Sequence, residues 1–206
     1  MKHLVTALAS AGILALGAAA HATTIIATFD TDAEGFTVDG FGLAHQSSGG
    51  NPGGYLRLND NAGGYATLTP GGAFFGALTP GATLSFDATL FSANGSSTTE
   101  FGEITLAGGG FTATVDAAIG VPPTGSWETY AVSLEAATWG LAPGDFAAML
   151  ASLDTFSLVI ETTLGVNEVI GIDNFAVTET VVPIPAAAFL FAPLAGAAVL
   201  RRRRLG

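Results

Sequence analysis

The stretch from residue 83 to residue 90 reads Thr83-Leu84-Ser85-Phe86-Asp87-Ala88-Thr89-Leu90. Its even-numbered residues are all apolar and its odd-numbered residues are all polar. A repeat of two residues is the period of a β-strand that buries one face and exposes the other. The same alternation recurs at 130–134 and at 156–160, so the chain is predicted to fold mainly as sheets.

Further strands are predicted around this one. Runs of β-branched and aromatic residues bounded by glycine, proline or asparagine occupy 25–29, 55–58, 65–68, 103–106, 111–115 and 169–177. One helix is predicted, because Phe146, Met149, Leu150 and Leu153 follow helical spacing and Asp145 stands where a cap is expected. This pattern predicts an all-β sandwich with one short helix.

Composition limits the possible functions. The 206 residues are 49% hydrophobic and 11% charged, which indicates one folded domain. The absence of cysteine excludes disulfides, thiol catalysis and thiolate metal sites. A net charge of −11 argues against nucleic acid as a partner, because phosphates require a basic surface.

The first 22 residues are predicted to be a signal peptide. Lys2 precedes an apolar run over 4–20, and Ala20-His21-Ala22 has the small-x-small pattern that signal peptidase cleaves, so cleavage is expected after Ala22. The alternative is a buried helix at the start of the fold.

The other end of the chain predicts a membrane span. Residues 181–200 contain no charge and are followed by Arg201, Arg202, Arg203 and Arg204. Twenty apolar residues are enough to cross a bilayer, and the arginines are expected to remain cytoplasmic. The alternative, a final strand of the domain, conflicts with the prolines within this stretch.

Within this tail, Val182, Pro183, Ile184 and Pro185 precede the apolar span and the arginines. This order resembles the PEP-CTERM class of sorting signals, in its Val-Pro-Leu-Pro-Ala variety. The resemblance implies a tail over 181–206 that an exosortase-type protease processes. It also implies an inner-membrane intermediate and a final place on the surface or in the extracellular matrix of a Gram-negative bacterium.

The part between the two ends is strongly acidic. Residues 23–182 contain all 17 acidic residues and one basic residue, Arg57, so their formal charge is 1 − 17 = −16. Such a surface repels anionic membranes and acidic polysaccharides unless divalent cations intervene. Solubility alone is the alternative explanation for this charge.

Five segments of this part resemble the laminin B (domain IV) family, in that family's order: 51–58, 84–86, 127–139, 145–161 and 171–175. The resemblance covers most of residues 29–177, within a predicted domain of residues 23–180. It implies a jelly-roll-like β-sandwich of extracellular proteins, related in form to carbohydrate-binding modules, and it supplies no catalytic residues.

Calcium is the one cofactor that the sequence suggests. Sandwiches similar to carbohydrate-binding modules often hold a structural calcium between the first and last strands, and Asp30, Asp32 and Asp173 lie at those positions. Calcium binds six to eight oxygens, and these residues could supply several. The alternative is that all three carboxylates form or close turns.

Trp127 and Trp139 are the candidate glycan-facing residues, because a flat indole ring can stack on the apolar face of a sugar. The alternative for both is packing in the core. A multi-histidine metal site in the mature domain is excluded, because His45 is the only histidine after residue 22.

The sequence therefore predicts an exported, non-enzymatic protein that binds extracellular polysaccharide or another matrix component. Two alternatives stay open: a structural matrix protein without a small ligand, and a glycoside hydrolase. The hydrolase would need two carboxylates placed in a cleft, and none of the 17 acidic residues lies in a recognisable catalytic motif.

The tail hypothesis predicts that deleting Arg201–Arg204 changes membrane retention or processing, because no cationic block would then hold the end of the span in the cytoplasm. Cell fractionation and immunoblotting measure the change. Replacing all four by lysine keeps the charge and serves as the control. Unchanged mature protein in the medium after the deletion would contradict the hypothesis.

Overall fold

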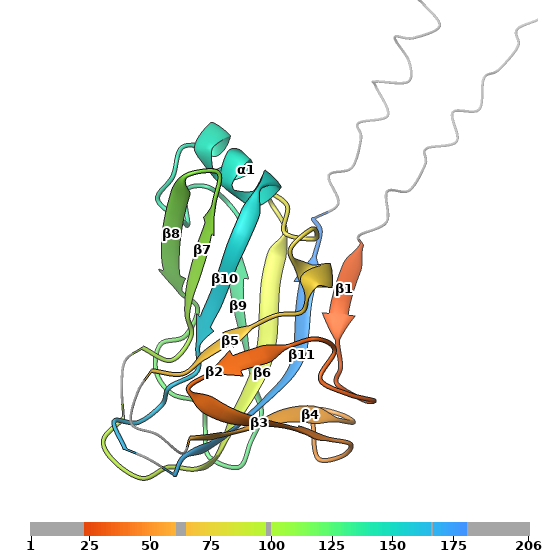
Figure 1. Cartoon of the computed structure of the whole chain (residues 1–206), viewed down its shortest axis with the longest axis vertical. Coiled ribbons are helices and arrows are strands. Elements are labelled where there is room, and N and C mark those ends of the chain that lie inside the picture. The colour runs from red at the N-terminus through yellow and green to blue at the C-terminus, as the bar shows by residue number, and fades with distance from the viewer. Residues whose placement is uncertain (1–22, 61–64, 98–99, 166, 181–206) are drawn as a thin grey trace, which may run out of the picture. The chain divides into compact units, whose positions relative to one another are not determined.

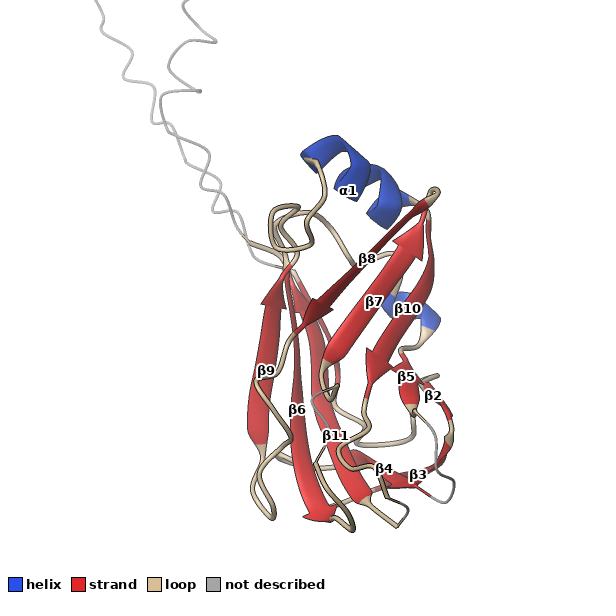
Figure 2. Ribbon diagram, turned by 90° about the vertical axis from the view of Figure 1, so that its left-hand side faces the viewer, coloured by secondary structure: helices blue, strands red, loops and turns tan. Residues whose placement is uncertain are grey.

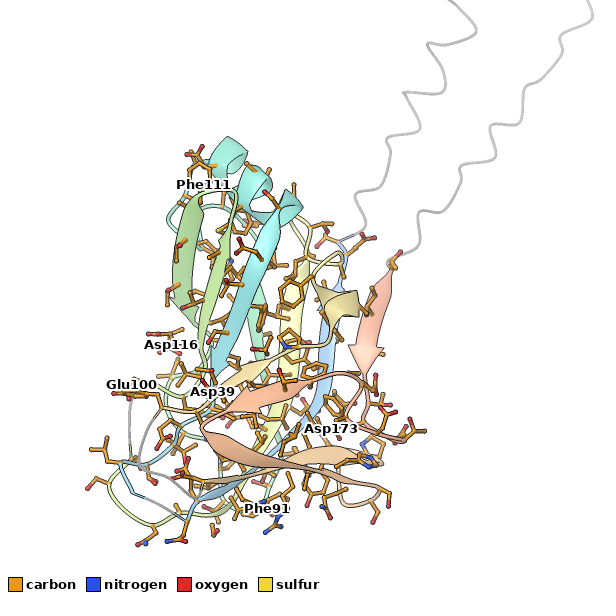
Figure 3. All side chains as sticks on the ribbon, in the orientation of Figure 1. Asp39, Phe91, Glu100, Phe111, Asp116 and Asp173 are labelled. Carbon is orange, nitrogen blue, oxygen red and sulfur yellow. The ribbon has the colours of Figure 1, made fainter. Side chains whose placement is uncertain are left out.

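Two antiparallel sheets form the domain, which is described in a computed structural model for residues 23–60, 65–97, 100–165 and 167–180. The sheets face each other as two layers, and the helix lies at one end (Figure 2). The predicted all-β sandwich with one short α-helix is confirmed. The predicted signal peptide with Ala20 and Ala22, the motif Val182–Pro185 and the arginines 201–204 lie outside the described residues.

The first sheet contains six strands (Figure 1). Their order is β3 (Phe41–Gln46), β4 (Tyr55–Asp60), β11 (Val169–Thr178), β6 (Thr83–Ser92) and β9 (Glu128–Ser133), and β1 (Thr24–Ala27) also pairs with β11. β4 pairs with 169–172 and β1 with 175–178, so these two short strands follow each other along one edge of β11.

The second sheet has the strand order β2 (Thr37–Asp39), β5 (Thr67–Thr69), β10 (Leu153–Val159), β7 (Glu103–Gly108) and β8 (Phe111–Asp116). From β4 to β7 the chain changes sheet at every step, and it changes again at β9, β10 and β11. This alternation brings segments that are distant in sequence together in one core, as in a jelly roll.

Each predicted strand corresponds to a strand of the structure, with ends shifted by up to three residues. β2 and β3 are not predicted by the sequence pattern. β3 contains Gly42 and His45 and lacks clear alternation, but its backbone pairs with β4 from Phe41↔Asp60 to Gln46↔Tyr55. Pairing with an existing neighbour thus stabilises a strand that its own side chains do not favour.

The predicted helix is α1 (Pro143–Ala151), and a short 3-10 turn, η1 (Gly72–Phe74), precedes β6. The expected cap is wrong: Ala142 is the N-cap residue, and no side chain caps the helix. Asp145 lies instead in the first turn, where its negative charge is favourable. The helical pattern also wrongly assigns Leu153 to the helix, whereas Leu153 is the first residue of β10.

Phe175 on β11 is the centre of the core. Its ring lies edge-to-face against Phe36 and Phe74, both at a centroid distance of 5.1 Å, and against Phe156 at 5.8 Å. It also stacks on Phe86 at 6.3 Å. Phe86 and Phe175 come from the first sheet and Phe156 from the second, so these rings join the two layers.

Among the described residues, none of the helices has the length and apolar character required to cross a membrane.

Phe175→Ala should lower the free energy of unfolding by about 3–5 kcal/mol, because it empties a fully buried site in contact with four rings. Urea denaturation of the full-length chain in mild detergent, followed by tryptophan fluorescence, measures the loss. Ile119→Ala is the control and should change stability by less than about 0.5 kcal/mol, because Ile119 is fully exposed. Equal effects of the two variants would contradict this description of the core.

Candidate functional site

The outward face of the six-stranded sheet carries the candidate site. One row of residues crosses this face from β6 through β11 and β4 to β3. Thr89 pairs with Gly171, Gly171 with Arg57, and Arg57 with Ala44. The neighbours of Arg57 on β4, Leu56 and Leu58, are fully buried on the opposite side, so the alternation of β4 directs Arg57 outward.

Three aromatic rings, of Tyr55, Phe91 and Trp127, lie over this row and form what we call the aromatic platform. The centroid of Tyr55 lies 5.4 Å from that of Phe91 and 5.6 Å from that of Trp127, and Phe91 and Trp127 are 6.3 Å apart. A Cβ atom on Gly171 would come within 2.7 Å of Cη2 of Trp127 and 2.9 Å of Cε2 of Phe91. Glycine at 171 therefore lets the rings lie directly on the backbone of β11.

Two of the three rings reach solvent. Phe91 is 38% exposed and Trp127 is half-buried, whereas Tyr55 is buried and its ring contacts both of them. Exposed aromatic surface of this kind is costly in water and offers an apolar contact area to a ligand.

Arg57 lies beside the platform. Its Cζ is 5.8 Å from the centroid of the Phe91 ring, and its Nε donates a hydrogen bond to Oδ1 of Asn59 at 3.2 Å. These two contacts fix the plane of the guanidinium next to the exposed rings.

A loop borders the platform on the same face. This loop, residues 47–54, connects β3 and β4 and is attached to two buried carboxylates, Asp87 and Asp173, which pair across β6 and β11. The backbone N–H of Asn51 donates to Oδ2 of Asp173 at 2.5 Å, and Nδ2 of Asn51 donates to Oδ2 of Asp87 at 3.1 Å. Asn174 and Thr129 supply further donors to Asp87, at 2.8 and 2.6 Å.

This environment raises the pKa of Asp173. Burial is the main cause that raises its pKa to about 6, and repulsion by Asp87 and Asp30 adds to it. Hydrogen bonds from the backbone N–H groups of Asn51 and Asn174 act in the opposite direction.

The three predicted calcium ligands do not form one set in this structure. Oδ1 of Asp30 accepts the N–H of Gly54 at 3.0 Å, which is the main cause that lowers its pKa, and Oδ2 accepts the hydroxyl of Thr28. Oδ1 of Asp32 accepts the N–H of Glu34 within its own turn. Asp30 and Asp173 both hold the 47–54 loop, but Asp32 does not take part.

Over the part of the chain that the structure describes, no group of three or more histidine, aspartate or glutamate side chains is arranged to hold a metal ion. The hydrogen bonds to Asp30 and Asp173 already occupy all four of their carboxylate oxygens. The residues as placed therefore fit an internally satisfied network better than a calcium site. Calcium binding stays a prediction.

Trp139, the second candidate for contact with glycan, lies in the core. It is 4% exposed, its ring stacks on Phe146 at a centroid distance of 6.0 Å, and its Nε1 donates to the carbonyl of Ser133. A ring in this position cannot stack on a ligand, so the packing alternative describes Trp139.

A second group of buried carboxyl groups lies outside the platform, where β4 and β10 end and β11 begins. Glu168 is fully buried and accepts hydrogen bonds from the N–H and hydroxyl of Thr162 and from the hydroxyl of Thr163. Burial is the main cause that raises the pKa of Glu161 to about 7, followed by repulsion from Glu168 and Asp60.

Two hollows of about 420 Å³ each flank α1. Alanine, leucine, proline and phenylalanine line most of their walls, and Glu135 is the only titratable residue lining either of them. Neither hollow brings two carboxylates together, so neither has the acid pair that a glycoside hydrolase requires.

Sequence reasoning identified Trp127 but missed Tyr55, Phe91 and Arg57 as its neighbours. Phe91 continues the outward, otherwise polar parity of Ser85, Asp87 and Thr89, so an apolar residue on the polar face was the available signal. The second signal was the single basic residue of an acidic domain.

Comparisons with known proteins bear on the fold. No family model and no curated protein matches the sequence. The structure is similar to the C-terminal family 22 carbohydrate-binding module of Xyn10B from Clostridium thermocellum, with a TM-score of 0.50 and 15% identity over 78% of this chain and 95% of that chain.

A second similar structure is the CBM22-1 xylan-binding domain of Xyn10C from Paenibacillus barcinonensis. Its TM-score is 0.51 and its identity 12%, over 76% of this chain and 95% of that chain. At such identities the likeness shows a shared β-sandwich fold and no shared activity.

Longer proteins also match. The chain covers 25% of an exo-β-agarase at a TM-score of 0.46 and 14% identity, and 28% of a Clostridium thermocellum xylanase 10B fragment at 0.47 and 12%. It therefore spans about a quarter of the length of these proteins.

Stability should depend on pH through Glu161 and Asp173, because both hold a proton more tightly in the folded chain than in the unfolded one. Their stabilisation is fully present below the unfolded pKa values of 4.5 and 3.8 and is lost as pH rises towards about 7 and about 6. Glu161→Gln should therefore reduce the loss of stability between pH 5 and about 7.5, as measured by urea denaturation.

Glu135→Gln is the matched control for this experiment, because Glu135 is exposed. It should leave the pH dependence of stability unchanged. An unaltered profile for Glu161→Gln would show that Glu161 does not titrate in this range.

Proposed function

We propose that this protein is a non-enzymatic glycan-binding module that binds extracellular polysaccharide on the outward face of its six-stranded sheet. The single observation that carries the proposal is the aromatic platform, where Phe91 and Trp127 present rings to solvent above Gly171. Ring faces of this kind match the apolar face of a pyranose, and neighbouring Arg57 and Asn59 supply hydrogen-bonding groups for its hydroxyls.

The fold is compatible with this proposal. The similar solved structures are carbohydrate-binding modules, and one is described as a xylan-binding domain. A sandwich of this kind can therefore serve as a polysaccharide-binding domain.

We further propose that the chain is exported and sorted. The resemblance of its ends to a signal peptide and a PEP-CTERM tail supports an inner-membrane intermediate, processing by an exosortase-type protease, and a final place on the cell surface or in the matrix. A laminin B-like relationship of residues 23–180 is proposed on the same basis. A purely structural matrix role without a small ligand is the second candidate, favoured by the strongly acidic composition of the domain.

The test is affinity electrophoresis of the full-length chain in mild detergent, through gels containing the exopolysaccharide of the producing cell. The wild-type chain should be retarded, and Trp127→Ala should weaken binding at least about tenfold, about 1.4 kcal/mol, because it removes part of the platform. Tyr65→Ala is the matched control, since Tyr65 is an exposed aromatic residue, 61% accessible, outside the platform.

Gels with calcium and gels with a chelator separate two explanations. Retardation in calcium alone would support a metal that offsets the acidic charge, whereas equal retardation would show that binding is independent of calcium. No retardation in either gel would contradict glycan binding and favour the structural matrix role.

A further inference from the structure

The position of Arg57 is unusual for the electrostatics of this domain. It is the only lysine or arginine in residues 23–182, against 17 acidic residues. Within the described part of the chain, its guanidinium has two side-chain partners, Asn59 and the ring of Phe91, and neither is a carboxylate. A lone cation would ordinarily find an ion pair in so acidic a protein, yet this one is held beside the aromatic platform without one.

The carboxylates in the neighbouring row of the same face do not neutralise it. Asp87 and Asp173 lie in the neighbouring row of the sheet, but both are buried and accept hydrogen bonds from the 47–54 loop and from Asn174. Their oxygens are therefore occupied by hydrogen bonds from the loop, from Asn174 and from Thr129. The positive charge of Arg57 remains available on the outward face.

The geometry of the guanidinium matches a planar anion. Asn59 occupies only Nε, so the Nη–H groups of Arg57 remain for a ligand. A guanidinium donates two parallel hydrogen bonds to a carboxylate, and such charge-assisted pairs are stronger than bonds to neutral hydroxyls.

The removal of water from the charge of Arg57 also favours an anionic ligand. A sugar that stacks on Phe91 and Trp127 would cover Arg57 and remove water from its charge. Covering an uncompensated charge is unfavourable, whereas a carboxylate on the ligand would compensate it. The overall charge of −16 would repel a polymer that is acidic at every residue, so the carboxylates should be well separated along the chain.

We propose that the platform binds a polysaccharide with isolated carboxylate-bearing sugars in an otherwise neutral chain, with the sugar rings on Phe91 and Trp127 and one carboxylate on Arg57. This inference rests on the proposed glycan-binding function. It makes Arg57 the residue that determines specificity and the rings the source of general affinity.

The test compares each polysaccharide with the same polymer after its carboxyl groups have been reduced to alcohols. The probes are glucuronoxylan and the exopolysaccharide of the producing cell, each native and reduced, and titration calorimetry on the full-length chain in mild detergent measures the dissociation constants. We expect reduction to weaken the binding of at least one of the two probes about tenfold or more.

Variants assign this difference to Arg57. Arg57→Gln should abolish the difference in affinity between the native and the reduced polymer, because no cation then remains to pair with the carboxylate. Arg57→Lys should retain only part of the difference, because an ammonium lacks the planar pair of donors. Trp127→Ala should weaken both forms by the same factor.

Each result is decisive for one of the two proposals. Equal affinity of the wild-type chain for native and reduced forms of both probes would overturn the carboxylate inference and leave glycan binding intact. A preference for native polymer that survives in Arg57→Gln would overturn the role of Arg57. Failure of every polymer to bind would overturn both proposals. A thermal melting curve for Arg57→Gln that coincides with that of the wild-type chain confirms that the variant is folded.

Discussion

The backbone pairing of β11 is the constraint on which the rest of the domain depends. Its first half pairs with β4 and its second half with β1 along one edge, while β6 pairs along the other. Because Ile170, Ile172 and Phe175 are fully buried, the register of this strand also fixes the centre of the core. A strand held on both edges and packed on one face has little freedom to shift by a residue.

The same register builds the outward face. Gly171 and Asp173 lie two residues apart on β11, and each supports a different part of the candidate site. Gly171 leaves room for the rings of Phe91 and Trp127, and Asp173 holds the 47–54 loop through Asn51. The platform and its bordering loop are therefore attached to the most firmly positioned strand of the domain. A rigid support of this kind reduces the entropy that a binding surface would lose when it captures a ligand.

Several carboxyl groups of this acidic domain are buried, and burial decides which partners they have. Asp87, Asp173, Glu161 and Glu168 are all buried in a domain with one basic residue, so amide and hydroxyl donors replace cations as the partners of Asp87, Asp173 and Glu168. Among the residues that the structure describes, this arrangement leaves Arg57 without an acidic partner, and it raises the pKa values of Asp173 and Glu161. The acidic composition thus isolates one positive charge on one face.

The sequence by itself determined the sheet class, the positions of most strands and the burial of Phe86, Leu158 and Phe146, because alternation and helical spacing are local properties of the chain. It also singled out Arg57 as the only lysine or arginine of residues 23–182 and Trp127 as a candidate for contact with a sugar. Tertiary structure alone decided that β3 forms, that Trp139 is buried, and that Asp32 lies apart from Asp173. It alone brought Tyr55, Arg57, Phe91 and Trp127 together, because they come from segments up to 72 residues apart that meet only when β4, β6 and β11 pair. Cross-strand neighbours of this kind depend on which strands pair and in what register, and no local pattern of residues records that choice.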